Sequence, residues 1–134
     1  MKPGVDYIGV NVAFICHDGD GRVLLHLRSP KNRDEHNRWD NGGGQVEFGE
    51  TLEEALVREV REEYGCELIT FNHLGQQTIL REHEGQPTHW LVNVYVCHVN
   101  PENVRVMEPE KNLGNDWFTL DDLPEPMHSI SGRW

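Results

Sequence analysis

The stretch that decides the fold is residues 44–66, which read GQVEFGETLEEALVREVREEYGC. Thr51 and Glu54 form a Thr-x-x-Glu capping box, a pattern typical of a helix N-terminus, and Gly65 suits a C-terminal cap. We therefore predict one α-helix over residues 52–64. Its core-facing stripe, with apolar residues at spacings of three and four, comprises Leu52, Ala55, Leu56, Val60 and Tyr64.

The predicted helix also carries three glutamates at positions i, i+3 and i+4, namely Glu59, Glu62 and Glu63. Side chains at this spacing lie on one face within about one turn, where like charges repel. A solvated acidic face is the ordinary interpretation, but Arg58 and Arg61 are too few to neutralise the acidic side chains of this helix. The alternative is that the carboxylates bind Mg²⁺ or Mn²⁺, hard cations that prefer oxygen ligands.

Three consecutive glycines, residues 42–44, precede this segment. Such a run is costly in any regular element because glycine loses much backbone entropy on folding. We therefore expect that something requires close backbone approach or positive φ there. A carbonyl without a neighbouring side chain can approach a metal ion or a phosphate closely, which agrees with the metal-binding interpretation of the glutamates.

The rest of the chain predicts an α+β fold with an antiparallel or mixed sheet. The turn sequence Asp18-Gly19-Asp20-Gly21 predicts that the first two strands form a hairpin. A polar loop that could turn a long hairpin is expected over residues 81–88, and a second loop, either a substrate lid or a connector, over residues 29–37. The predicted strands cover residues 7–16, 23–27, 45–48, 68–80, 90–99 and 117–120.

Length and charge restrict the classes of function. A chain of 134 residues is the size of one domain, and its net charge of −11 with a pI near 5.0 argues against polymeric nucleic acid as a partner. No signal peptide opens the chain, and no apolar run approaches the ~18 residues that span a bilayer, so we expect a cytoplasmic protein without a membrane partner. The three cysteines and eight histidines show no spacing typical of a disulfide framework or a zinc site.

The residues of the decisive stretch resemble a known family signature. Gly44, Glu50 and the run Arg58-Glu59-Val60-Arg61-Glu62-Glu63-Tyr64-Gly65-Cys66 are similar to the Nudix box, G-x5-E-x7-R-E-U-x-E-E-x-G-U, where U is a bulky apolar residue. Every charged and glycine position is matched, and Cys66 at the last apolar position is a mild departure. Before the box, the run Trp39-Asp40-Asn41-Gly42-Gly43-Gly44 keeps the tryptophan and glycines of the family and lacks its proline.

The resemblance implies a metal site. Glu59 and Glu63 would be the main ligands of Mg²⁺ or Mn²⁺, and Glu62 would be a third ligand or the base that activates water. The backbone carbonyl of Gly43 is a further expected ligand. Family members often recruit one more carboxylate from a loop, for which Glu110 is the first choice and Glu108 the second. The catalytic residues implied in this way are Glu50, Arg58, Glu62 and Glu63.

Supporting and substrate-binding roles are implied by the same resemblance. Glu50 and Arg58 would form an ion pair that aims the helix at the glycine loop. The residues expected to contact substrate are Arg28, Gly44, Asn115 and Asp116. Arg28 resembles a phosphate-binding position, and Asn115 and Asp116 lie where MutT-like members have polar groups against a base.

The implied activity is metal-dependent hydrolysis of the pyrophosphate bond in a nucleoside diphosphate derivative. The run Glu108-Pro109-Glu110-Lys111 favours MutT-like pyrophosphohydrolases of (deoxy)nucleoside triphosphates, among them oxidised ones such as 8-oxo-dGTP. Hydrolysis of an NDP-sugar or of ADP-ribose remains an alternative, and so does a non-catalytic module that binds a nucleotide as a sensor. All three box glutamates are present, which favours an enzyme.

The implied architecture is one Nudix domain over residues 1–134, with a mixed sheet and a packed catalytic helix in an α/β/α sandwich. Many members end in a second long helix, but only eleven residues follow Leu123 here, and two of them are prolines. We therefore expect the C-terminal helix to be short or missing. Its loss would expose one sheet face, so a homodimer is also considered.

Overall fold

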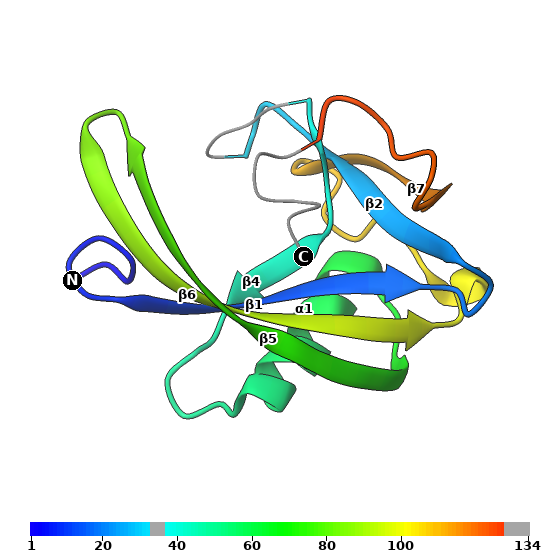
Figure 1. Cartoon of the computed structure of the whole chain (residues 1–134), viewed down its shortest axis with the longest axis horizontal. Helices are drawn as coiled ribbons and strands as arrows, with labels where there is room; N and C mark the ends of the chain where they lie inside the picture. The colour runs from blue at the N-terminus through cyan, green and yellow to red at the C-terminus, as the bar shows by residue number, and fades with distance from the viewer. Residues whose placement is uncertain (33–36, 128–134) are drawn as a thin grey trace.

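The computed structural model of the chain describes residues 1–32 and 37–127, in which one mixed sheet packs against one α-helix (Figure 1). The helix is α1, Leu52–Tyr64, and a short 3-10 turn, η1, spans Pro101–Asn103. The strands are β1 (Gly9–His17), β2 (Arg22–Arg28), β3 (Trp39–Asp40), β4 (Gly42–Gln45), β5 (Leu68–His83), β6 (Gln86–Val99) and β7 (Asn112–Thr119).

Helix α1 begins and ends where its capping residues predict. The Thr51 N–H donates to Glu54 Oε1 at 2.9 Å, and the Glu54 N–H donates to Thr51 Oγ1 at 3.1 Å, so both halves of the capping box are present. Gly65 adopts the left-handed conformation with φ 66° and closes the C-terminus. The predicted stripe is confirmed, since Ala55, Leu56, Val60 and Tyr64 are fully buried and Leu52 packs at their edge.

The sheet runs in the order β3-β2-β1-β6-β5, with β4 paired to β1 and β7 paired to β2. β1 and β6 are parallel and the other pairs are antiparallel, which confirms the mixed sheet. The predicted first hairpin is confirmed, with His17 opposite Val23 beside its turn. β4 pairs with residues 11–14 of β1, which brings the glycine run next to the centre of the sheet.

The predicted strand at residues 45–48 is wrong, because β4 spans Gly42–Gln45 and contains all three glycines. None of the three has positive φ, so close approach is the reason for the run. A Cβ on Gly42 would lie 1.9 Å from a ring carbon of Phe14 on β1. Glycine is therefore needed at Gly42 because the Phe14 ring lies against the backbone of β4.

The long hairpin predicted around residues 81–88 is confirmed, but the extent of its polar loop is wrong. β5 and β6 form one long hairpin that meets at a two-residue turn, Glu84-Gly85, with φ 51° and 80° (Figure 1). Positive φ at both central residues is the geometry of a turn whose twist matches the strands, so the ladder continues to His83 and Gln86. The final strand likewise begins earlier than predicted, at Asn112.

The core lies between α1 and one face of the sheet. Phe14, Leu24 and Tyr95 pack against the buried stripe of α1, and the ring of Tyr64 meets Phe14 edge-on at 6.0 Å. Cys16, Cys66 and Cys97 are free thiols buried in or beside this core, where they pack as small apolar residues.

The opposite face of the sheet carries a smaller apolar cluster around Ala13, Val92 and Val94. Within the described residues no second α-helix covers it, so the second helical layer of an α/β/α sandwich is not seen there. The expectation of a short or missing C-terminal helix agrees with residues 120–127, and residues 128–134 lie outside the described part. Helix α1 is too short and too polar to cross a membrane, as is every other helix of the described chain.

Candidate active site

The carboxylates of α1 lie directly under the glycines of β4. A Cβ on Gly44 would lie 2.1 Å from the carboxylate carbon of Glu59, so only glycine leaves room for that side chain. The Gly43 N–H donates a hydrogen bond of 3.0 Å to Glu63 Oε2. The glutamate spacing places the carboxylates on one face of α1. Because the glycines of β4 carry no side chains, these acidic oxygens can approach the backbone of β4.

Arg58 links these carboxylates to the segment that precedes the helix. Its Nε and Nη2 donate to the two oxygens of Glu50 at 2.7 and 2.9 Å, and Nη2 also donates to the Gln45 carbonyl at 2.9 Å. Its Nη1 donates to Glu59 Oε1 at 2.8 Å and to Glu62 Oε2 at 3.2 Å. The hydrogen bonds from Arg58 lower the pKa of Glu50 to about 2, so Glu50 stays ionised.

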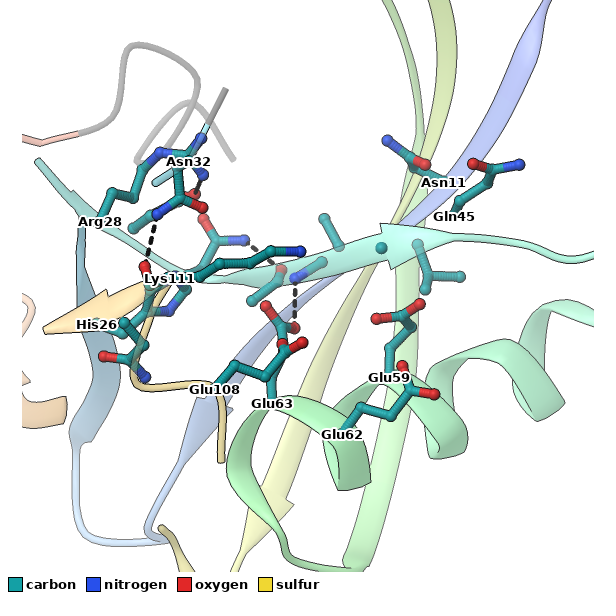
Figure 2. A pocket seen from close by; sticks show the side chains of 18 of the residues that line it. Asn11, His26, Arg28, Asn32, Gln45, Glu59, Glu62, Glu63, Glu108 and Lys111 are labelled. Atoms are coloured by element: carbon teal, nitrogen blue, oxygen red, sulfur yellow. Dashed lines mark hydrogen bonds and ion pairs between the residues drawn. The ribbon is translucent and has the colours of Figure 1, made fainter. Parts of the chain in front are cut away.

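These groups line one cavity of about 510 Å³ between α1, β2, β4 and the loop before β7. Figure 2 shows Glu59, Glu62 and Glu63 reaching from α1 towards β4, while Arg28 and Lys111 enter from the opposite side. The acidic residues of the lining are Asp40, Glu59, Glu62, Glu63 and Glu108. Glu59, Glu62 and Glu63 make the α1 end of the cavity acidic, and Arg28 and Lys111 make the other end cationic. Two of the acidic residues lie near these cations, since Asp40 pairs with Arg28 and Glu108 belongs to the same turn as Lys111.

The acidic end is under electrostatic strain. Burial raises the pKa of Glu63 well above its ordinary value, and the charges of Glu59, Asp40 and Glu108 raise it further, while the hydrogen bond from Gly43 lowers it. Burial also raises the pKa of Glu59, against the opposing effect of its hydrogen bond from Arg58. A nearby divalent cation would relieve both the desolvation and the repulsion.

The donor set fits a hard divalent ion. Carboxylate and carbonyl oxygens are the ligands that Mg²⁺ prefers, and it commonly uses one or two carboxylates with water and substrate phosphates. Within residues 1–32 and 37–127, no group of three or more His, Cys, Asp or Glu side chains is arranged so that it could hold a metal ion by itself. Arg58 and the Gly43 N–H each occupy an oxygen of the nearest carboxylates. These residues therefore suit an open metal site, in which water and substrate phosphate complete the coordination of the ion.

The structure brings most of the predicted site residues together. Glu59, Glu62, Glu63, Gly43, Gly44 and Arg28 all line the cavity, and Glu50 and Arg58 form the expected ion pair. Arg28 Nη1 also donates to Asp40 Oδ2 at 3.3 Å across β2 and β3. Part of the expected loop over residues 29–37, namely residues 33–36, lies outside the described chain.

Three predicted residues do not line the cavity. Glu110 is exposed, whereas Glu108, the second choice, is in the lining. Asn115 and Asp116 are on β7 and are also absent from the lining, but Asn115 lies opposite the cavity residue His26 and accepts a hydrogen bond of 2.7 Å from the cavity residue Asn112. Asp116 pairs with Leu25 in the β2–β7 ladder, one residue out of step with the cavity residue His26, so strand alternation directs its side chain to the opposite face.

The sequence prediction missed several polar residues of the cavity, namely Asn11, His26, Asn32, Asp40, Lys111 and Asn112. His26 is buried, and its Nδ1 lies 2.9 Å from the Tyr64 hydroxyl. Asp40 lies opposite His26 in the β2–β3 ladder, and Asn112 lies opposite Arg28 in the β2–β7 ladder. Asp40 and Lys111 belonged to runs that the family resemblance marked, but no role was assigned to them. Asn11, His26 and Asn112 enter the cavity through strand register, and Asn32 enters it from the loop after β2.

Comparisons with known proteins agree with this geometry. The chain is 27% identical over 135 residues to putative nudix hydrolase 1 of Caenorhabditis elegans, covering 99% of this chain and 34% of that protein. It is 33% identical over 106 residues to the oxidized purine nucleoside triphosphate hydrolase of Mus musculus, covering 77% of this chain and 62% of the mouse protein. The chain therefore spans between about a third and somewhat under two thirds of the length of these two relatives.

A crystal structure of a MutT NUDIX hydrolase from Burkholderia pseudomallei matches the fold with a TM-score of 0.81 and 33% sequence identity, over 92% of each chain. A family model described as the NUDIX domain matches residues 8–134, which include β1, the glycine run, α1 and every residue of the acidic end. This match, and the carboxylate helix packed under a glycine strand, show that the chain belongs to the Nudix family.

Proposed function

We propose that the chain is a metal-dependent pyrophosphohydrolase that cuts the pyrophosphate bond of a nucleoside diphosphate derivative. One observation carries this proposal: a single cavity joins three carboxylates of α1 at one end to Arg28 and Lys111 at the other. A polyphosphate can bind in so acidic a cavity when divalent cations lie between the two sets of negative charges. The cationic end then contacts the part of the substrate beyond the metal ions.

Glu59 and Glu63 are the residues that would hold Mg²⁺ or Mn²⁺, together with Glu108 and the Gly43 carbonyl. The bound ion supplies charge neutralisation on the phosphate oxygens and a more acidic water molecule. Glu59 suits this role because it is close to β4 and carries a raised pKa from burial, so a cation stabilises its ionised form. Glu108 is preferred to Glu110 because Glu108 lines the cavity.

Glu62 is suited to accept the proton of the attacking water. Its side chain is 54% exposed, and its contact with Arg58, at 3.2 Å, is longer than those of Glu50 and Glu59 with the same guanidinium. A base must move its proton on to solvent, which an exposed carboxylate can do. Arg28 and Lys111 would bind and orient phosphate oxygens, so that the chain contributes mostly position and electrostatics.

The substrate class that we propose is a (deoxy)nucleoside triphosphate, cleaved to the monophosphate and pyrophosphate, with oxidised purines such as 8-oxo-dGTP among the candidates. The likeness to a mouse protein named oxidized purine nucleoside triphosphate hydrolase supports this choice. The amide and imidazole groups along the cavity, from Asn11, His26, Asn32 and Asn112, offer hydrogen-bonding partners for a base.

The test is a panel of nucleoside triphosphates, 8-oxo-dGTP, NDP-sugars and ADP-ribose, each with Mg²⁺ and with Mn²⁺, followed by identification of the products. Expected is metal-dependent release of pyrophosphate from a triphosphate, with kcat lowered by about 10²- to 10⁴-fold in Glu62→Gln. Glu63→Gln should lower turnover as well, without loss of the fold. Tight nucleotide binding with no turnover across the panel would replace the enzyme with a sensor, and unchanged rates in both variants would remove these roles.

A further inference from the structure

Ser29 joins two loops at the cationic end of the cavity. It follows β2 directly, and only 2% of its surface is exposed. Its N–H donates to the Lys111 carbonyl at 3.1 Å, and its hydroxyl donates to the Glu110 carbonyl. From the same loop, Asn32 Nδ2 donates to the Lys111 carbonyl at 2.5 Å. Three hydrogen bonds therefore connect the loop after β2 to the turn that precedes β7.

That turn carries the two charged residues which the cavity receives from outside the sheet and helix. Glu108 and Lys111 both line the cavity and lie three residues apart, with Lys111 reaching along β4 in Figure 2. The turn is closed internally, because the N–H groups of Lys111 and Asn112 both donate to the Glu108 carbonyl at 2.9 Å. These hydrogen bonds hold the main chain of the turn together, so a contact that places the turn also places the main-chain positions from which both side chains extend.

Ser29 contacts the turn at its main chain, next to the residue whose side chain stays outside the cavity. The hydroxyl binds the main chain at Glu110, whose side chain is exposed, while Glu108 lines the cavity. The Ser29 oxygen also accepts a hydrogen bond from the Lys31 N–H at 3.1 Å. Removing this hydroxyl would take away one hydrogen bond that it donates and one that it accepts, both at part-buried positions.

We propose that Ser29 is a positioning residue which, with Asn32, holds Glu108 and Lys111 in the cavity and so sets the affinity of the site for its divalent cation and for phosphate. The proposal rests on the proposed function, because it gives Glu108 and Lys111 the roles assigned there. Ser29 is not assigned any contact with the cation or the phosphate. It acts through the main chain of residues 110 and 111.

The first measurement is the Mn²⁺ affinity of the full chain without nucleotide, from the electron paramagnetic resonance signal of free Mn²⁺. Ser29→Ala should weaken Mn²⁺ binding by about 10- to 100-fold, the range typical of groups that orient metal ligands. Asn32→Ala removes one of the three hydrogen bonds from a half-buried side chain, so it should fold even if Ser29→Ala does not, and weaken binding less. Unchanged Mn²⁺ affinity in folded variants of both residues overturns the proposal.

A double-mutant cycle separates positioning from a general structural effect. If Ser29 acts through Glu108, adding Ser29→Ala to Glu108→Gln causes little further loss of Mn²⁺ affinity. Losses that simply add would mean that Ser29 acts elsewhere, which overturns the proposal. In steady-state kinetics Ser29→Ala should raise KM for the nucleotide as well, since Lys111 is displaced with the turn, whereas Glu108→Gln should act mainly on the metal dependence.

The outcomes distinguish this proposal from the proposed function. A wild-type chain that binds Mn²⁺ and hydrolyses no nucleotide overturns the hydrolase, while the Mn²⁺ affinities of the variants still decide the role of Ser29. An active wild-type enzyme whose Ser29→Ala and Asn32→Ala variants bind Mn²⁺ normally overturns the positioning role alone. A wild-type chain that binds no Mn²⁺ overturns both.

Discussion

Arg58 holds Glu50 with two parallel hydrogen bonds, from Nε to Oε2 at 2.7 Å and from Nη2 to Oε1 at 2.9 Å. The remaining nitrogen, Nη1, donates to Glu59 Oε1 at 2.8 Å. The Glu47 N–H donates to Glu50 Oε1 at 2.8 Å, so Glu50 is fixed from both sides. One planar guanidinium thereby determines how the segment before α1 and the first carboxylate of the cavity lie relative to each other.

Replacing Arg58 by lysine keeps the charge and removes the fork, so Arg58→Lys should lower metal affinity and kcat by about 10- to 100-fold. The matched control is Arg61→Lys on the same helix. Arg61 donates to both oxygens of Glu67, at 2.9 and 3.0 Å, but this pair is exposed and outside the cavity. Titration with Mn²⁺ and steady-state kinetics measure the difference; equal effects of the two substitutions would contradict the role of Arg58.

Glu108 and Glu110 offer a second matched pair, two residues apart on one turn. Glu108→Gln should weaken Mn²⁺ binding by about tenfold or more, because it removes one negative charge from the cavity. Glu110→Gln should leave the affinity unchanged, since its side chain is exposed and outside the lining. Calorimetric titration of both variants decides between them, and a larger loss in Glu110→Gln would restore Glu110 as the additional ligand.

The helix and its carboxylates could be predicted because their determinants are local. The hydrogen bonds between Thr51 and Glu54 and the left-handed Gly65 depend on neighbours in the chain, and so does the spacing that aligns Glu59 with Glu63. The turn Glu84-Gly85 was also local, but it lies within a polar run that resembles a loop, and the ladder between β5 and β6 overrides that polarity.

The cationic end could not be predicted in the same way, because it is built by contacts between distant segments. The turn that carries Glu108 and Glu110 is hydrogen-bonded to Ser29, about eighty positions away in the chain. Asp40 enters the cavity through its register with His26, and a shift of one residue would turn it to the other face. The local sequence around Glu108 or Asp40 contains no information about these distant contacts.

The dependence of stability on pH should change when the metal binds. Burial, and then the charge of Glu59, raise the pKa of Glu63 in the metal-free fold. Above the ordinary value of 4.5 the folded chain therefore retains protons that the unfolded chain has lost, so the free energy of unfolding falls as pH rises through this window. A bound cation favours the ionised carboxylates and removes this loss.

Saturating Mg²⁺ should therefore raise the Tm more at about pH 8 than at about pH 5, where protons compete for the carboxylates. Scanning calorimetry in EDTA and in Mg²⁺ across this range makes the comparison. In Glu63→Gln the metal-free chain should lose much of the decline in stability with rising pH, because the strained carboxylate is gone. An equal gain from Mg²⁺ at both pH values would mean that the acidic end does not bind the ion.

Gly44 tests whether the approach of β4 to α1 is what orients the carboxylates. A Cβ at this position would lie 2.1 to 2.4 Å from the carboxylate atoms of Glu59, which must then move. The group displaced is the end of a side chain, so Gly44→Ala should fold with little change in Tm, while a shift of about 1 Å in a metal ligand costs about 100-fold in kcat. Gly114→Ala is the control, because nothing lies within 4 Å of a Cβ there and its φ is not in the left-handed region. Thermal unfolding and kinetics of the pair check the prediction, and full activity in Gly44→Ala would show that Glu59 need not occupy the position that this glycine leaves for it.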